Sequence, residues 1–164
     1  MALAAALRDI LVTAVDLVLW RHAQAQDGTP DEARALSAKG TRQAERVAAW
    51  LRERIAGHVT LLASPAARAQ QTAQAYGAAI RTRSELAPDA TPERILGAAG
   101  WPHGHGTVIV VGHQPALGAA AALMLTGRPA PWDIKKGGVW WLRSRSGAPP
   151  LVVAVITPRL ARCK

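Results

Sequence analysis

Three places in the chain carry cationic or nucleophilic side chains directly after a short apolar run. Arg21 and His22 follow the first run, Ser64 and Arg68 follow the second, and His113 follows the third. Arginine offers a fork of N–H donors that matches phosphate oxygens. A neutral imidazole is a nucleophile near pH 7. If these side chains lie together, with no carboxylate among them, they form a strongly positive site suited to binding and attacking a phosphoryl group.

The apolar runs have the length and composition of buried strands, and segments with helical spacing of apolar residues lie between them. We expect strands at 16–20, 59–63 and 107–111, and helices at 44–55 and 66–79. In an open α/β sheet, ligands bind outside the carboxyl ends of parallel strands. Parallel pairing of the three strands would therefore bring the reactive side chains to one edge of the sheet.

The rest of the chain completes the same pattern. A short strand is expected within 81–92, helical turns at 92–98, a helix between Pro115 and Gly127, and a hairpin of strands 139–143 and 151–157. The fold class that follows is α/β: one domain with three α/β/α layers, a mostly parallel sheet and a C-terminal antiparallel hairpin.

Composition bounds the class of protein. A chain of 164 residues with 49% hydrophobic residues is one domain's worth of core, and we divide it into an N-terminal extension at 1–15 and a domain at 16–164. Charged residues interrupt the apolar start, so we expect neither a signal peptide nor a membrane span. The single cysteine, Cys163, leaves no intrachain disulfide and fits the cytoplasm.

The net charge of +9 leaves a second class of function open, a basic binding module without catalysis. Its best candidate site is a run of basic and aromatic residues, which can bind and stack on nucleic acid: Lys135, Lys136, Trp140, Trp141, Arg143 and Arg145. We favour instead a strand of the sheet with an exposed basic edge. A third use would fit a phosphatase, in which Lys135 and Lys136 near the pocket rim steer an acidic phosphoprotein. His103 and His105 lack the neighbouring ligands of a metal site.

Three motifs carry a resemblance to a known family. Residues 17–24 read Leu-Val-Leu-Trp-Arg-His-Ala-Gln, residues 64–72 read Ser-Pro-Ala-Ala-Arg-Ala-Gln-Gln-Thr, and residues 110–115 read Val-Val-Gly-His-Gln-Pro. In these motifs the chain resembles the histidine phosphatase (phosphoglycerate mutase-like) superfamily over residues 16–157, with Ala23 where the family usually has Gly. The short length and the segments at 36–40 and 135–141 are most similar to the SixA-type branch, which is assigned to phosphohistidine in proteins.

The resemblance implies a phosphoglycerate mutase-like fold and a role for each matched residue. His22 would be the nucleophile and become transiently phosphorylated, while Arg21, Arg68 and His113 would hold the phosphoryl oxygens. Three further residues are expected to contact the substrate or close its loop: Gln24, Ser64 and Glu85. The resemblance implies no metal and no cofactor.

One part of the larger members of the superfamily is missing. They protonate an alkoxide leaving group with an added carboxyl group, for which only Glu85 or Asp89 stands in roughly the right interval. Loss of a general acid typically costs about 10²–10⁴ in rate. It matters less for phosphohistidine, because the leaving imidazole has a pKa of about 6.5.

We therefore expect a monomeric cytoplasmic phosphatase acting on a phosphohistidine-containing protein, with neither nucleic acid nor a membrane as its partner. The alternatives are a small phosphomonoesterase that uses Glu85 or Asp89 as its general acid, and the basic binding module.

Overall fold

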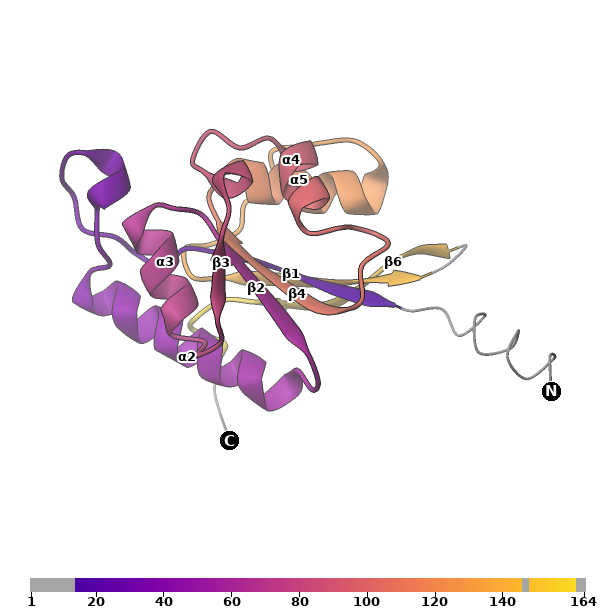
Figure 1. Cartoon of the computed structure of the whole chain (residues 1–164), viewed down its shortest axis with the longest axis horizontal. Helices are drawn as coiled ribbons and strands as arrows, with labels where there is room; N and C mark the ends of the chain where they lie inside the picture. Colours follow the sequence, from indigo (N-terminus) through magenta and orange to yellow (C-terminus); the bar gives the residue numbers. More distant parts are fainter. Residues whose placement is uncertain (1–13, 146–147, 162–164) are drawn as a thin grey trace.

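The structure, a computed structural model, describes residues 14–145 and 148–161. Its strands form one sheet, in the spatial order β3 (Ile80–Thr82), β2 (Val59–Ala63), β4 (Gly106–Gly112), β1 (Val15–Arg21), β5 (Val139–Arg145) and β6 (Ala148–Ile156). Two layers of helix enclose this sheet: α2 (Ala38–Arg54) and α3 (Ala67–Gln74) on one face, α4 (Pro92–Ala98) and α5 (Ala116–Thr126) on the other (Figure 1). Short 3-10 turns, η1 (Asp31–Ala33) and η2 (Ser84–Leu86), lie in the loops.

The first four strands are parallel, and the C-terminal hairpin is antiparallel. β1 pairs with β4, β4 with β2, and β2 with β3 in parallel. β5 runs antiparallel to β1, and β6 runs antiparallel to β5. These findings confirm the expected three-layer α/β fold with its added hairpin.

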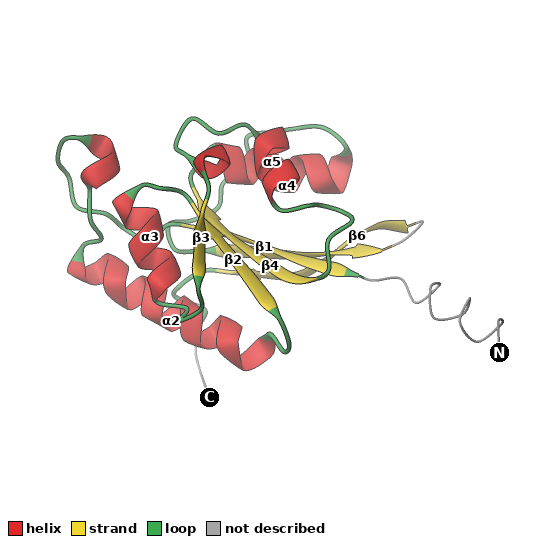
Figure 2. Cartoon of the chain, in the orientation of Figure 1, coloured by secondary structure: helices red, strands yellow, loops and turns green. Residues whose placement is uncertain are grey.

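Alternate side chains of each central strand feed two separate cores. Each core lies under one of the two helix layers that Figure 2 shows on the two faces of the sheet. In β1, Leu17 and Leu19 join the cluster under α4 and α5, whereas Val18 and Trp20 join the cluster under α2 and α3. Because both faces of these strands are buried, their sequences are continuous apolar runs instead of alternating ones. The same burial holds the strand ends rigidly in place.

The helices start and end at residues suited to those positions. Ser37 caps α2 by accepting a hydrogen bond from the backbone N–H of Gly40, and Thr91 caps α4 in the same way through Arg94. Gly127 ends α5 in the left-handed conformation, with a φ of 74°.

The expected elements are present, and the ends of most of them differ from the predicted ones. The strand at 59–63 and the turns at 92–98 have the predicted bounds, and the expected strands at 16–20 and 107–111 each gain one residue at both ends. The predicted C-terminus of helix α3 was wrong by five residues: the helix ends at Gln74, not at residue 79. The reason is Gly77, whose φ of 86° turns the chain away from the helix.

The N-terminal extension falls mostly on residues 1–13, which lie outside the described residues. β1 begins at Val15, one residue before the expected domain boundary. No helix in the described ranges has both the length and the apolar composition needed to cross a bilayer.

Candidate active site

The carboxyl ends of β1, β2 and β4 lie level at one edge of the sheet. In the parallel register, Val111 of β4 is opposite both Trp20 of β1 and Ala63 of β2. The pairing continues past the strands, because the backbone N–H of His22 donates to the Gly112 carbonyl at 3.0 Å. The predicted convergence of the strand ends is therefore what the structure shows.

His22 is held by one of its two ring nitrogens. Nδ1 lies 2.7 Å from the carbonyl oxygen of Ala23, and because a carbonyl can only accept, Nδ1 carries the hydrogen. Burial is the main cause that lowers the pKa of His22 to about 4; the Ala23 hydrogen bond opposes this shift, and the positive charges of Arg68, Arg21 and Lys136 add to it. The ring is neutral at pH 7, with the lone pair on Nε2.

His113 faces His22, with the two ring centroids 5.1 Å apart. Its Nε2 lies 2.8 Å from Oγ of Ser64, and that oxygen also accepts the backbone N–H of Ala66 at 3.2 Å. Nδ1 of His113 is buried and has no hydrogen-bond partner among the described residues. Burial lowers the pKa of His113 to about 3, helped by the nearby His22 and Arg68. His113 is therefore also neutral, with one ring nitrogen available to a ligand.

Arg68 lies in the first turn of α3 with its side chain only 6% exposed. Nη1 donates to the Asp31 carbonyl oxygen at 2.6 Å, and Nη2 donates to the Asp31 carboxylate at 2.8 Å. Hydrogen bonds from Arg34 and Arg68 lower the pKa of Asp31, so this carboxylate is ionised. Asp31 belongs to η1, within the long loop that follows β1.

Arg21 is held from the opposite side, by the loop that leads into β5. Its Nη1 donates to the Ile134 carbonyl at 2.7 Å and lies 3.4 Å from the carboxylate of Asp133. Its Nε is buried and has no partner in the described part of the chain. Burial lowers the pKa of Arg21, with Asp133 opposing the shift, and the group remains a cation. The expectation of a site without carboxylates was thus wrong, because Asp31 and Asp133 each pair with one of its arginines.

Ala23 fills the place of the family's usual glycine without strain. None of the described residues other than glycine has a positive φ. The side chain of Ala23 is fully buried, and its backbone N–H donates to Oγ1 of Thr72 at 3.0 Å. The same hydroxyl donates to the Arg68 carbonyl at 2.7 Å, which ties the loop of His22 to helix α3.

The other predicted site residues are placed less closely. Gln24 contacts its surroundings through its backbone, whose N–H donates to Oε1 of Gln43 at 3.0 Å. Glu85 lies in η2 and is hydrogen-bonded to Ser84. Its own backbone N–H is the main cause that lowers its pKa, so the carboxyl group is ionised at neutral pH. Among the described residues, no hydrogen bond or ion pair joins Glu85 or Asp89 to the two histidines and two arginines.

The two aromatic residues proposed for nucleic-acid stacking pack against the rest of the fold to different degrees. Trp141 is 5% exposed, and Trp140 packs against Trp132 with ring centroids 5.4 Å apart. Burial withdraws the Trp141 ring from base stacking, and the half-buried Trp140 ring is partly covered by Trp132. No cluster of three or more His, Cys, Asp or Glu side chains occurs within the described ranges.

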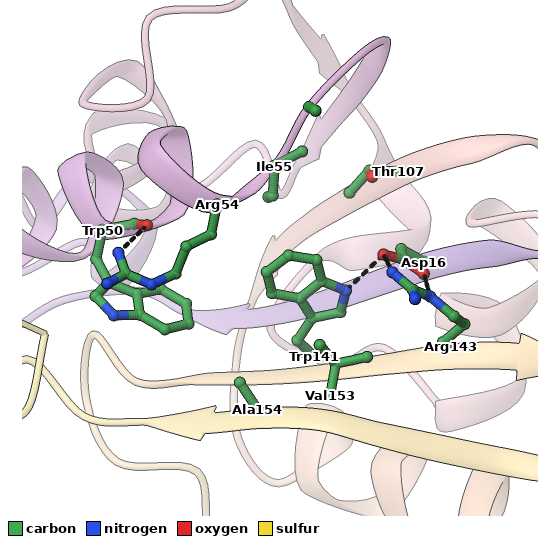
Figure 3. A pocket seen from close by; sticks show the side chains of 10 residues that line it. Asp16, Trp50, Arg54, Ile55, Thr107, Trp141, Arg143, Val153 and Ala154 are labelled. Atoms are coloured by element: carbon green, nitrogen blue, oxygen red, sulfur yellow. Dashed lines mark hydrogen bonds and ion pairs between the residues drawn. The ribbon is translucent and has the colours of Figure 1, made fainter.

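A hollow of about 510 Å³ lies at the far end of β1 from His22, between α2 and the sheet (Figure 3). Trp50 and Trp141 form its apolar wall, and Asp16 lies at its edge. The Asp16 carboxylate accepts hydrogen bonds from Trp141 Nε1 at 2.9 Å and from Arg143 Nη2 at 2.7 Å. The carboxylate of this hollow is thus already paired, and we assign the chemistry to the edge of the sheet that carries His22.

Comparisons with known proteins agree with this geometry. The family model described as histidine phosphatase superfamily (branch 1) matches residues 17–91. A solved structure assigned to the phosphohistidine phosphatase SixA of Nakamurella multipartitia is 29% identical, with a TM-score of 0.75 over 88% of this chain and 96% of that one. No curated protein matches the sequence.

Two less identical structures share the fold. The protein histidine phosphatase SixA complexed with tungstate is 22% identical, with a TM-score of 0.77 over 88% of this chain and 97% of that one. An alpha-ribazole-5'-P phosphatase structure from Escherichia coli is 16% identical, with a TM-score of 0.70 over 89% of this chain and 98% of that one. The three motifs, the parallel strand ends and these matches all make the chain similar to the histidine phosphatase superfamily, whose model matches residues 17–91.

Proposed function

We propose that the chain is a cytoplasmic, monomeric phosphatase that hydrolyses phosphohistidine on a partner protein, with His22 as the nucleophile and no metal or cofactor. The observation that carries this proposal is the state of the His22 ring. Its Nδ1 is fixed to the Ala23 carbonyl, so Nε2 presents a lone pair. A depressed pKa of about 4 keeps that lone pair free of a proton at neutral pH.

The first step transfers the phosphoryl group from one imidazole to another. The Nε2 lone pair of His22 forms a P–N bond while the P–N bond of the substrate breaks. If the distal nitrogen of the substrate ring is protonated, the leaving group departs as neutral imidazole. Water then attacks phosphorus, the His22 P–N bond breaks, and phosphate leaves with a proton passing from the water to solvent.

The donors around His22 suit the oxygens of the transferring group. Arg21 Nε and His113 Nδ1 are both buried without a partner in the described part of the chain. A buried polar group left unpaired costs about 1–3 kcal/mol, so a ligand that pairs these groups recovers that cost. We infer that phosphoryl oxygens accept hydrogen bonds from Arg21 Nε and His113 Nδ1. Arg68 donates to a further phosphoryl oxygen once the phosphoryl group displaces Asp31.

Ser64 acts in this scheme as a positioning residue. Its hydroxyl lies 2.8 Å from His113 Nε2. If Ser64 donates its proton to Nε2, His113 carries its own hydrogen on Nδ1, which is the nitrogen without a partner. Ser64 would thus select the tautomer of His113 that can donate to phosphate.

No carboxyl group in the described part of the chain is suited to act as a general acid, which favours P–N over P–O substrates. Asp31 and Asp133 lie close to the arginines, but hydrogen bonds from cationic side chains lower the pKa of each. Glu85 has a lowered pKa, and across the described residues no hydrogen bond or ion pair joins it to the catalytic cluster of Arg21, His22, Arg68 and His113, which disfavours it as a proton donor. The His22 phosphoenzyme and the substrate share the same kind of leaving group. A site able to release phosphate from its own imidazole therefore needs no further acid for the substrate's imidazole.

Phosphate release from a phosphohistidine-carrying protein and from a phosphoserine peptide, measured side by side, tests the proposal. We expect turnover of the first alone, and its loss in His22→Ala but not in His58→Ala, an exposed matched control. Comparable turnover of both substrates would favour the phosphomonoesterase and make Glu85 and Asp89 the next residues to replace. Absence of turnover of either would favour the basic binding module.

A further inference from the structure

A second basic surface lies beside the catalytic edge, which is the edge of the sheet where β1, β2 and β4 end. This surface lies outside the catalytic cluster. A groove of about 230 Å³ separates the N-terminal half of α2 from the turn that follows β6. Its lining is cationic and contains no acidic residue: Lys39, Arg42, Gln43, Arg46, Pro158 and Arg159. The arrangement follows from the sequence, because residues at i, i+3 and i+7 project from one side of a helix.

The cations of this groove are not neutralised by the rest of the fold. Across residues 14–145 and 148–161, no ion pair joins Lys39, Arg42, Arg46 or Arg159 to a carboxylate. Arg46 instead donates to the Pro158 carbonyl at 3.3 Å, which ties the two walls together. Four like charges are thus held close together around one hollow.

The groove is continuous with the loop that carries the nucleophile. Gln43, which lines it, accepts the backbone N–H of Gln24 at 3.0 Å. A Cβ placed on Gly137 would lie 2.9 Å from Cγ of Pro158 and 3.7 Å from Cβ of Ala23, so Gly137 connects the groove to the residue after His22. Lys136, the neighbour of Gly137, is close enough to lower the pKa of His22.

We propose that this groove docks an acidic surface of the phosphorylated partner protein, next to the phosphohistidine bound at His22. The inference rests on the proposed function for the identity of the phosphorylated group. Charge complementarity favours an acidic protein as the partner, because Lys136 and the groove form one basic strip that leads to the phosphate site. Its lining has no aromatic ring on which a base could stack, so a protein fits better than a single-stranded nucleic acid.

The test compares a protein substrate with a small one. Lys39→Glu/Arg42→Glu reverses two groove charges that donate no side-chain hydrogen bond among the described residues, and glutamate suits the start of a helix. Arg94→Glu is the matched control: it is exposed in the first turn of α4, on the opposite face of the sheet. The substrates are a phosphohistidine-carrying protein of net negative charge and free phosphohistidine.

We expect the double variant to lower kcat/KM for the protein about tenfold or more at low salt, the size of effect that electrostatic steering produces. The loss should shrink as salt screens the charges. Turnover of free phosphohistidine should stay within about twofold of wild type, because the attraction between this small substrate and two charges on the protein surface contributes little to its binding energy. Arg94→Glu should leave both activities unchanged.

Three results would overturn the inference: unchanged kcat/KM for the protein, an equal loss with free phosphohistidine, or a loss of the same size in Arg94→Glu.

Binding of the unphosphorylated partner and of a single-stranded oligonucleotide, each by calorimetry, separates this inference from the proposed function. If wild type hydrolyses neither substrate but the double variant binds the acidic protein more weakly, docking stands and the proposed function fails. Loss of oligonucleotide binding alone would replace the protein partner with nucleic acid.

Discussion

Arg68 and Asp31 form a two-point contact inside the catalytic cluster. The guanidinium donates at 2.8 Å to the Asp31 carboxylate and at 2.6 Å to the Asp31 backbone carbonyl. The side chain of Asp31 is 56% exposed, whereas that of Arg68 is 6% exposed. A buried cation is thus held by an accessible anion, which an incoming phosphoryl group can displace.

Asp31→Asn should bind inorganic phosphate more tightly than wild type. The substitution removes the competing negative charge but keeps the backbone carbonyl that positions Arg68. Because one competing ion pair with a solvent-exposed carboxylate is removed, we expect an inhibition constant lower by up to about fivefold. Competitive inhibition of phosphohistidine hydrolysis by phosphate measures it, with Glu32→Gln, also exposed in η1, as the control. Weaker inhibition in Asp31→Asn would show that the carboxylate assists anion binding.

His22 makes the folded state sensitive to acid. Burial lowers its pKa to about 4, and an unfolded imidazole titrates near its ordinary value of about 6.5. Between these values the unfolded chain binds more protons, so the free energy of unfolding falls as pH falls through this window. Urea unfolding at pH 7 and pH 4.5 should show a smaller acid loss in His22→Asn than in wild type. An equal loss in both would contradict the depressed pKa; His58→Asn, on the surface, is the control.

Thr72 joins the loop of the nucleophile to helix α3. Its buried hydroxyl accepts from the Ala23 N–H and donates to the Arg68 carbonyl. Thr72→Val keeps the shape and leaves the buried Ala23 N–H unpaired, so we expect a loss of about 1–3 kcal/mol in the free energy of unfolding. Thr60→Val, at a half-buried strand position of β2, is the matched control. Equal urea midpoints for the two variants would exclude the coupling.

Gly40 allows α2 to approach the catalytic loop. A Cβ at this position would lie only 1.9 Å from the Gln24 carbonyl oxygen, whereas a Cβ at Gly97 of α4 would meet nothing within 4 Å. Gly97→Ala should stabilise the protein by about 0.5–1 kcal/mol, because alanine favours the helix. Gly40→Ala should destabilise it and lower phosphatase activity, since the loop of His22 must move. Thermal melting compares the pair, and a stabilised Gly40→Ala would disprove the close contact.

The catalytic edge was predictable because it depends on strand ends. Arg21, His22 and His113 directly follow apolar runs, and the parallel register puts those run ends side by side. Arg68 was found in the same way, from its place one helical turn after the second strand. Such positions are fixed by local pattern together with one rule of topology.

Asp31 and Asp133 could not be found by the same reasoning. Each comes from a loop without periodicity, and each reaches its arginine over many residues of chain: 37 from Asp31 to Arg68, and 112 from Asp133 to Arg21. Nothing in the local sequence distinguishes them from other exposed carboxylates. The groove along α2 was missed for a related reason, because its second wall, Pro158 and Arg159, comes from the far end of the chain.

The most direct test of the account is to trap the phosphoenzyme. Enzyme mixed with a radiolabelled phosphohistidine protein is stopped in alkali within milliseconds, digested and mapped by mass spectrometry, with His22→Ala in parallel. The account predicts a transient phosphoryl group on Nε2 of His22, the nitrogen that the Ala23 hydrogen bond leaves free. Phosphate on another residue, or release of phosphate with no labelled enzyme at any time, would contradict it.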